Sequence, residues 1–230
     1  LMDFGRRLFA KRVPTSYSHL VMQHYGWRAR PGGGLFILED PGRSLRARDI
    51  LDGALQTGCM LEPQLSYDGT RIVFSYVDCP NGPLSHTAVS NDQDPSHNFY
   101  HIWEVNVDGT GLRQITRDAY DDLMPCYLPD GGIAFMSTRR KGYARCFGGQ
   151  FSTRWDVYTL HRMDGDGSNI RTLSYHDTNE WYPAVSHTGH ILYARWDYID
   201  RDAVTHQNLW ASRPDGTNPI AVWGNATPNP

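Results

Sequence analysis

The chain of 230 residues lacks the short motifs of several common enzyme classes. No Cys-x-x-Cys-His string occurs, which excludes covalent attachment of a c-type haem within these residues. Neither the Gly-x-Ser-x-Gly elbow of α/β-hydrolases nor the His-Glu-x-x-His motif of zinc proteases is present, and the nearest stretch, GGQFST, does not fit the elbow. The sequence therefore gives little support to nucleophilic catalysis.

The chain also has neither a large excess of one charge nor a long apolar run. The 22 basic residues nearly balance the 25 acidic ones, with a net charge of −3 and no basic tract, so nucleic acid is not an expected partner. No apolar run reaches the roughly 18 residues of a transmembrane helix, so no membrane span is expected. A hydrophobic content of 40% is enough for a sizeable core.

What the sequence has in quantity is the Asp-Gly turn. The pair recurs between apolar runs, in YDGTR, NVDGT, PDGGI, GDGSN and RPDGT. Asp-Gly suits tight hairpins, because glycine adopts positive φ freely and aspartate tolerates it. The flanking runs, such as RIVFSYV and GIAFMST, are rich in β-branched and aromatic residues and alternate in part. These features predict an all-β chain.

The turns belong to a larger repeat. The aromatic residues Phe74, Phe135 and Tyr193 mark equivalent strands at intervals of roughly 50–60 residues. Two hairpins per interval predict a β-propeller of four-stranded antiparallel blades, whose strands we call a to d. The expected blades lie at about 5–51, 61–117, 124–175 and 181–225, the first without its strand a. Propellers close with about four to eight blades, so we expect these four to be part of a larger propeller.

The amino-acid sequences of the repeats resemble those of a known family. PQLSYDGTRIVFS and PCYLPDGGIAFMSTR, each followed by a hairpin of the type IWEVNVDGTGLRQIT, resemble the WD-repeat-like blades of TolB-type propellers over roughly residues 60–225. The stretches LPDGGIAFMSTRRKGYARC and RWDYIDRDAV are similar to the middle propeller domain of the hydrazine synthase alpha subunit and related exported bacterial proteins. The resemblance implies a periplasmic or extracellular location. It also implies haem in the full-length protein, although no cofactor is expected in this segment.

The order of the strands predicts one chemically dense face. In an up-and-down sheet the a–b and c–d turns share one end, and the b–c and d–a connectors share the other. The Asp-Gly turns all fall at the first end. The long connectors, roughly 13–33, 78–100, 139–155 and 196–208, are all b–c and fall at the second. Long loops in a compact fold are usually functional or disordered.

The candidate binding residues are those of the b–c and d–a connectors with side chains suited to a ligand or a partner. They are His24, Trp27, Arg28, His86, His97, His101, Asp122, Arg139, Arg140, Arg145, Trp155, His176, Glu180, Asp197 and Arg201. No catalytic residue and no metal site is assigned.

Structural alternatives stand beside these roles. Asp122 and Glu180 suit metal or substrate ligands at a channel rim, or acceptors for loop backbone amides. The arginines after strand b (Arg12, Arg139, Arg140 and Arg195) suit a carboxylate or phosphate clamp, or bridges between blades. Histidines in such loops are most often exposed and without a role.

The four cysteines allow three complete pairings in an oxidising compartment. A disulfide between Cys126 and Cys146, within one blade, is the favoured pairing. The alternative is a zinc site that combines Cys79, Cys146 and a loop histidine, for which no Cys-x-x-Cys spacing exists.

Three functions follow from the sequence. The favoured one is a non-catalytic binding and assembly module of a larger exported bacterial protein, whose partners are other domains or subunits of that assembly. The second is a segment of a multihaem redox enzyme resembling the hydrazine synthase alpha subunit. The third is a carbohydrate- or peptide-binding protein of the envelope, suggested by the aromatic and acidic residues of the loops.

Overall fold

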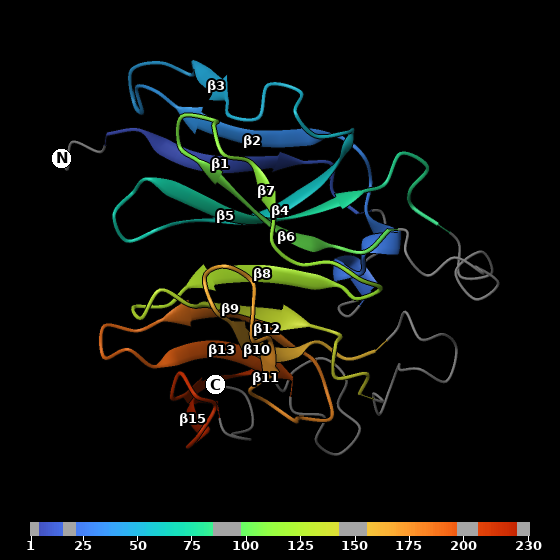
Figure 1. Cartoon of the computed structure of the whole chain (residues 1–230), viewed down its shortest axis with the longest axis vertical. Coiled ribbons are helices and arrows are strands. Elements are labelled where there is room, and N and C mark those ends of the chain that lie inside the picture. Colours follow the sequence, from blue (N-terminus) through green and yellow to red (C-terminus); the bar gives the residue numbers. More distant parts are fainter. Residues whose placement is uncertain (1–4, 16–21, 85–97, 143–155, 197–206, 225–230) are drawn as a thin grey trace.

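The structure, a computed structural model, describes residues 5–15, 22–84, 98–142, 156–196 and 207–224. These residues form β-strands and two single-turn 3-10 helices, η1 (Met22–His24) and η2 (Gly26–Arg28). The strands make four antiparallel sheets that follow one another along the long axis of the molecule (Figure 1). The described part of the chain contains no helix that could cross a bilayer. The prediction of an all-β chain is confirmed.

Each sheet is a simple meander, and we call the sheets blades 1 to 4. Among the described residues, blade 1 has three strands, in the places predicted for strands b, c and d. It consists of β1 (Arg7–Arg12), β2 (Gly33–Leu38) and β3 (Ala47–Asp49). Blade 2 consists of β4 (Gly58–Leu65), β5 (Arg71–Asp78), β6 (His101–Asn106) and β7 (Arg113–Gln114).

Blades 3 and 4 have four strands each, again in sequential order. Blade 3 consists of β8 (Asp122–Tyr127), β9 (Ile133–Ser137), β10 (Thr159–Met163) and β11 (Arg171–Thr172). Blade 4 consists of β12 (Glu180–Val185), β13 (Ile191–Trp196), β14 (Gln207–Ser212) and β15 (Ile220–Trp223). The outer strands β7 and β11 have two residues each.

The core lies between successive blades. Alternate residues of a strand point to opposite faces of its sheet, so each inner strand supplies two interfaces. In β5, Phe74 faces blade 1 and Val73 faces blade 3, and both are fully buried. In β9, Phe135 packs against blade 2 and Met136 against blade 4. Burial of one such side chain contributes about 1.5–3 kcal/mol, so blade-to-blade packing is the main source of stability.

The Asp-Gly turns connect strands a to b and c to d. Their aspartates accept hydrogen bonds from the backbone N–H two residues on, as Asp68 does from Thr70 (3.0 Å) and Asp215 from Thr217 (2.9 Å). The c–d turns also touch the preceding blade. A Cβ on Gly216 would lie 2.6 Å from the carbonyl oxygen of Leu173, and the φ of Gly216 is +84°. Glycine is therefore required there both for its backbone conformation and for space.

Strand a of blades 2, 3 and 4 contains the same irregularity. The pairing with strand b shifts register between Leu61 and Gln64 in β4, and β8 and β12 shift at the equivalent place. Within each shift the residue before a proline has positive φ. These residues are Glu62, Met124 and Tyr182, with φ of 48°, 55° and 54°. A bulge of this kind redirects a side chain and bends the strand.

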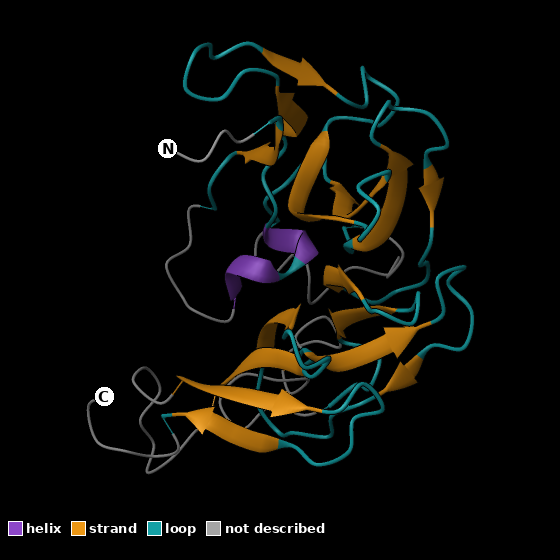
Figure 2. Cartoon of the chain, turned by 90° about the vertical axis from the view of Figure 1, so that its left-hand side faces the viewer, coloured by secondary structure: helices purple, strands orange, loops and turns teal. Residues whose placement is uncertain are grey.

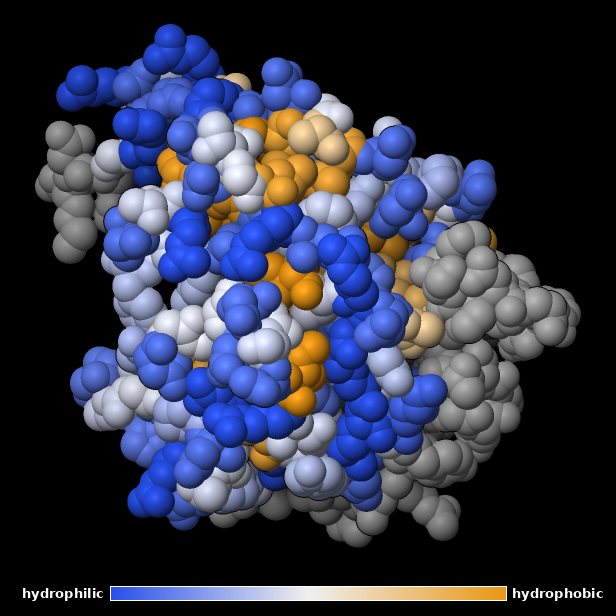
Figure 3. Space-filling model, viewed as in Figure 1, coloured by the Kyte–Doolittle hydropathy of each residue, from blue (hydrophilic) through white to orange (hydrophobic). Residues whose placement is uncertain are grey.

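The first b–c connector folds inward. Its helices η1 and η2 lie between blades 1 and 2 on one side and blades 3 and 4 on the other (Figure 2). Tyr25 and Trp27 are at most 1% exposed and join the core cluster that blades 2, 3 and 4 share. The outer surface seen in Figure 3 is mainly hydrophilic, with apolar residues in separate small areas.

Candidate functional site

The described parts of the b–c and d–a connectors meet at one end of the blades, which we call the loop-rich end. They are residues 13–15, 22–32, 50–57, 79–84, 98–100, 115–121, 138–142, 156–158 and 173–179. The backbone N–H of Leu84 donates a hydrogen bond to Trp27 O (2.8 Å). This bond joins the b–c connectors of blades 1 and 2. For the described residues, the prediction that these connectors share an end agrees with the structure.

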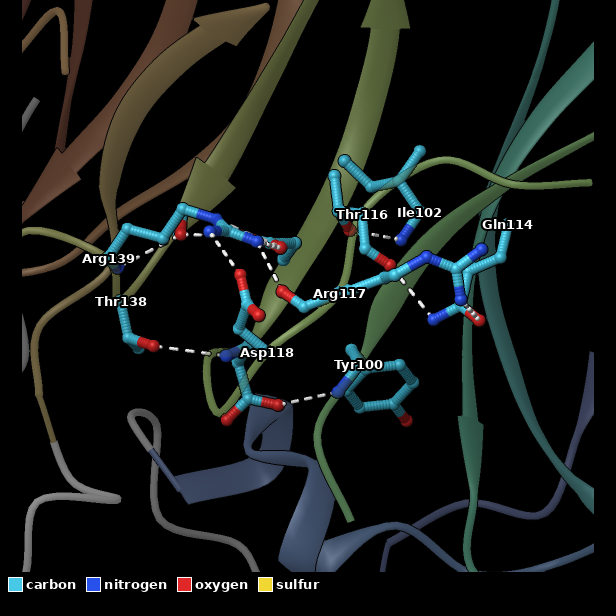
Figure 4. Close-up of polar contacts among 11 residues, drawn as sticks. Tyr100, Ile102, Gln114, Thr116, Arg117, Asp118, Thr138 and Arg139 are labelled. Atoms are coloured by element: carbon cyan, nitrogen blue, oxygen red, sulfur yellow. Dashed lines mark hydrogen bonds and ion pairs between the residues drawn. The ribbon is translucent and has the colours of Figure 1, made fainter. Parts of the chain in front are cut away.

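Asp121 joins three connectors. Its Oδ1 accepts hydrogen bonds from the backbone N–H groups of Gly26 (3.0 Å) and Tyr100 (2.9 Å). Its own backbone N–H donates to Thr138 Oγ1 (3.0 Å). Figure 4 shows Tyr100 and Thr138 approaching this segment from opposite sides. Since Asp121 is fully buried, it acts here as an acceptor for loop amides.

The next blade has the same kind of hydrogen bond between a connector side chain and the backbone at the start of strand c. Asn179, also fully buried, accepts a hydrogen bond from the backbone N–H of Tyr158 (2.8 Å), as Asp121 does from Tyr100. The same position thus holds the start of strand c in blades 2 and 3. An amide serves as well as a carboxylate there, which indicates that acceptor geometry matters and charge does not.

Asp122, at the start of β8, is fully buried and ion-paired. It accepts hydrogen bonds from Ser137 Oγ (2.6 Å) and Arg139 Nε (2.9 Å), and Arg139 Nη2 lies 2.7 Å from its Oδ2. Arg139 also approaches Asp118 Oδ2 (3.5 Å) and donates to the backbone oxygen of Arg117 (Figure 4). The guanidinium therefore joins strand b to the connector that precedes strand a.

Glu180 occupies the same place in blade 4. Its carboxylate, also fully buried, accepts hydrogen bonds from Arg195 Nε (3.0 Å), Ser174 Oγ (2.8 Å) and the backbone N–H of Leu160 (2.9 Å). The bond from the leucine ties blade 4 to strand c of blade 3. Both acids are thus held by arginines and hydroxyls of the protein itself, which favours their structural interpretation.

Arg140 and His176 also bond within the protein. Arg140 Nη2 donates to the backbone oxygen of His176, and His176 Nε2 lies 2.8 Å from Thr178 Oγ1. His101, at the start of β6, is half-buried, and burial lowers the pKa of its imidazole. These contacts stiffen the loop-rich end, and whether any of these residues also binds a ligand stays a prediction.

The first connector places its predicted residues differently from the expectation of an exposed face. His24 is 4% exposed and Trp27 is 0% exposed. Arg28 donates to the backbone oxygen of Leu84 (3.1 Å) and stacks over the ring of Trp27. Burial, with the nearby charge of Arg12, lowers the pKa of His24 to about 4. In this arrangement the tryptophan is a core residue.

The remaining predicted residues lie outside the described part of the chain. They are His86, His97, Arg145, Trp155, Asp197, Arg201 and Cys146. Cys126 is a buried free thiol, and burial raises its pKa to about 12. Because its expected partner is not described, the pairing stays a prediction.

Sequence reasoning missed a buried tyrosine pair beneath the loop-rich end. The rings of Tyr25 and Tyr158 lie 4.9 Å apart, and Tyr25 donates its hydroxyl hydrogen to Asp156 O (3.1 Å). Burial raises the pKa of the Asp156 carboxyl to about 6. The available signal was the recurrence of tyrosine just before strand c, at Tyr100 and Tyr158, at the same spacing as Asp121 and Asn179.

The opposite end carries a shallow groove. Its volume is about 360 Å³, and it lies between turns of blades 3 and 4. The lining includes Asp130, His190, Arg213 and two prolines. Asp130 is held by Arg162 (2.9 Å), so this carboxylate is already paired within the protein.

Comparison with known proteins shows the fold. No protein-family model and no curated protein sequence matches the chain. Among solved structures, hydrazine synthase of Kuenenia stuttgartiensis matches with a TM-score of 0.67 and 15% identity, over 96% of this chain and 32% of that chain. TolB of Agrobacterium tumefaciens matches with a TM-score of 0.59 and 15% identity, over 94% of this chain and 61% of that chain.

An oligogalacturonate lyase of Vibrio parahaemolyticus also matches, with a TM-score of 0.54 and 16% identity, over 82% of this chain and 47% of that chain. The chain thus spans less than two thirds of each of these structures. At such identities the likeness shows the fold alone, and it confirms that the four sheets are blades of a TolB-like β-propeller.

Proposed function

We propose that the chain is a non-catalytic binding and assembly module of a larger exported bacterial protein. In this proposal it lies in the periplasm or outside the cell, its loop-rich end binds the partner, and its blades continue into further sheets. The partners are other domains or subunits of the same assembly.

One observation carries the assembly part of the proposal, namely the exposed apolar face of blade 4. Ile102 and Leu160 occupy one position of strand c in blades 2 and 3 and are at most 1% exposed, because the next blade covers them. Leu209 occupies this position in blade 4 and is 37% exposed. Its cross-strand neighbour Trp223 is 56% exposed and Ile220 is 48% exposed. A face patterned like an interface between blades suits a further sheet as its cover.

The experiment compares two substitutions of an exposed leucine in the full-length protein. Leu209→Asp places a charge on the apolar face of blade 4. Leu45→Asp places the same charge in a turn where the leucine is 92% exposed. We expect Leu209→Asp to lower the melting temperature or to dissociate the assembly in light scattering, and Leu45→Asp to change neither. Equal behaviour of the two variants would contradict the proposal.

The second candidate is a segment of a multihaem redox enzyme, which the likeness to hydrazine synthase over 96% of the chain favours. The residues present do not fit covalent haem, since the sequence has no Cys-x-x-Cys-His string and Cys59, Cys79 and Cys126 are buried free thiols. In this case haem belongs to other parts of the full-length protein. A Soret band in the purified full-length protein would favour this candidate over the module.

The third candidate, a carbohydrate- or peptide-binding envelope protein, has the likeness to an oligogalacturonate lyase in its favour. We expect glycan-array binding that Trp155→Ala abolishes if this candidate is right. Trp27→Ala is unsuited to the test, because Trp27 is buried in the core. Binding to no glycan would remove the carbohydrate part of this candidate.

A further inference from the structure

The groove between the turns of blades 3 and 4 is large enough for a small ligand. Its volume of about 360 Å³ falls within the range of small-molecule sites. One wall is the a–b turn of blade 3, at residues 129–130, and the other is formed by both turns of blade 4, at residues 188–190 and 213–214. We call it the blade 3–4 groove.

His190 and Arg213 stand opposite each other in this groove. The pairing of β13 with β14 extends to Ile191 and Ser212, and the next residue on each strand is His190 or Arg213. Residues opposite each other in an antiparallel pair place their side chains on one face, with Cβ atoms about 4.5–5.5 Å apart. Both residues line the groove, so their side chains are close enough to contact the same ligand.

Among blades 2 to 4, only blade 4 has this pair of donors. The same positions hold Arg71 and Asn106 in blade 2, where Arg71 bonds to the buried Glu104 (3.1 Å). In blade 3 they hold Gly132 and Asp164. The a–b and c–d turns of the three blades close with equivalent backbone hydrogen bonds. The two donors of blade 4 are therefore not required by the geometry of the turns.

Both side chains have donors available to a ligand. Within the described part of the chain, the guanidinium of Arg213 forms no hydrogen bond or ion pair, although its charge acts on Asp215 of the same turn. His190 Nδ1 lies 3.0 Å from Thr188 Oγ1, which lies 2.9 Å from Ser186 Oγ. Ser186 Oγ accepts from the backbone N–H of His190 (3.1 Å). When the hydroxyl hydrogens follow this order, Nδ1 is an acceptor, and Nε2 of the neutral ring carries the hydrogen that a ligand accepts.

We propose that the blade 3–4 groove binds a small organic carboxylate with an apolar body. The guanidinium of Arg213 pairs with the carboxylate, a contact for which its planar fork is suited. His190 Nε2 donates a second hydrogen bond. Pro129 and Pro214 line the groove and pack against the apolar body. The site lies at the end of the blades opposite the loop-rich end, so it goes beyond the assembly role proposed above.

Charge favours a monocarboxylate over other ions. Asp130 also lines the groove, where it accepts from Arg162 Nη2 (2.9 Å). The same buried arginine donates to Pro214 O (3.2 Å) and so joins the two walls. A phosphate dianion would meet the carboxylate of Asp130, and a metal cation would meet the guanidinium of Arg213. A single negative charge balances Arg213 without adding to the repulsion from Asp130.

Calorimetric titration of the full-length protein with two probes tests the proposal. Benzoate represents a free organic acid, and an N-acetylated tripeptide that ends in a leucine with a free carboxylate represents the C-terminus of a peptide. We expect at least one probe to bind. Arg213→Gln should weaken it by about tenfold or more, the factor that corresponds to loss of a charged hydrogen bond, and His190→Phe by about threefold or more.

The matched controls are Arg171→Gln, at an exposed position of β11, and His187→Phe, at an exposed position of the same turn as His190. Neither residue lines the groove, so both variants should keep the affinity of the unaltered protein. The groove variants should also keep its melting temperature, because Arg213 is exposed and His190 is half-buried. Losses of affinity in the controls that equal those in the groove variants would overturn the assignment.

The amide form of each probe shows whether the carboxylate is recognised. Benzamide and the tripeptide amide lack the negative charge, so they should bind at least about tenfold more weakly, and Arg213→Gln should weaken them little further. Binding of benzoate assigns a free acid as a ligand, and binding of the tripeptide assigns a chain end. Failure of both probes to bind, or tighter binding of inorganic phosphate, would overturn the proposal. The Leu209→Asp result is independent of these titrations, so the two proposals fail separately.

Discussion

Arg139 Nη2 lies 2.7 Å from Asp122 Oδ2, in an ion pair whose carboxylate is fully buried and whose guanidinium side chain is only 15% exposed. The pair joins the end of strand b to the start of strand a in blade 3. Arg195 and Glu180 form its counterpart in blade 4, 2.9 Å apart. Two blades thus close their loop-rich end with the same pairing, although one uses aspartate and the other glutamate.

Removal of one charge from this pair should destabilise the fold strongly. Asp122→Asn leaves the guanidinium of Arg139 partly buried without its counter-charge, a change that typically costs about 3–5 kcal/mol. Asp118→Asn removes a carboxylate that contacts the same arginine but is 70% exposed, and it should cost less than about 1 kcal/mol. Urea unfolding of both variants gives the comparison, and equal losses would show that burial does not control the effect.

Glycines of the two turn classes should differ in their tolerance of alanine. A Cβ on Gly216 would lie 2.6 Å from Leu173 O, whereas a Cβ on Gly131 would meet nothing within 4 Å. Both have positive φ, so each alanine costs about 1–2 kcal/mol in backbone strain. Gly216→Ala should cost more, because the preceding blade must also move. Thermal unfolding measures the difference, and a larger loss for Gly131→Ala would refute this account.

Stability should fall between about pH 6.5 and pH 4 because of buried histidines. Burial lowers the pKa of His161 from 6.5 to about 4. The unfolded state therefore binds a proton in this range that the folded state does not, and the free energy of unfolding decreases as the pH falls. Above pH 6.5 this contribution is fully present, and below pH 4 no more is lost.

Replacement of His161 tests the origin of this pH dependence. In His161→Gln the slope between pH 6.5 and pH 4 should become shallower, even if the absolute stability also changes. Urea unfolding at several pH values gives the slope. An unchanged slope would assign the effect to other groups, such as His24, whose pKa is also lowered to about 4 by burial.

The chemical state of Cys126 can be read by alkylation. As a buried thiol whose pKa is raised to about 12, it should not react with iodoacetamide in the folded protein and should react once urea unfolds the chain. Mass spectrometry after digestion identifies the modified residue. Protection in urea that ends only when a reductant is added would instead support the disulfide with Cys146.

Much of the fold followed from local sequence. The Asp-Gly turns and the aromatic positions Phe74, Phe135 and Tyr193 placed the strands, because turn chemistry and alternation act within a few residues. The three strands of blade 1 were foreseen for the same reason. The positive φ of Met124 and Tyr182 was not, because a proline normally predicts an extended neighbour and only contacts between blades override that preference.

The site was harder to predict. Asp122 and Glu180 were singled out because acids before the proline of strand a recur in the sequence, and both a binding and a structural role were left open for them. That Arg139 and Arg195 would neutralise them was left open, because it depends on which side chains the blades bring together. His24 and Trp27 were expected at an exposed face, and their burial arises from contacts with distant blades that no local pattern reveals.

The inward fold of the first connector has a mechanical consequence. Tyr25 reaches Asp156 of blade 3 and His24 reaches Tyr182 of blade 4, although both residues leave from blade 1. The connector therefore packs across the inner side of the blades and links blade 1 directly to blades 3 and 4. A substitution that displaced His24 or Tyr25 would accordingly loosen the contact of this connector with the third and fourth blades.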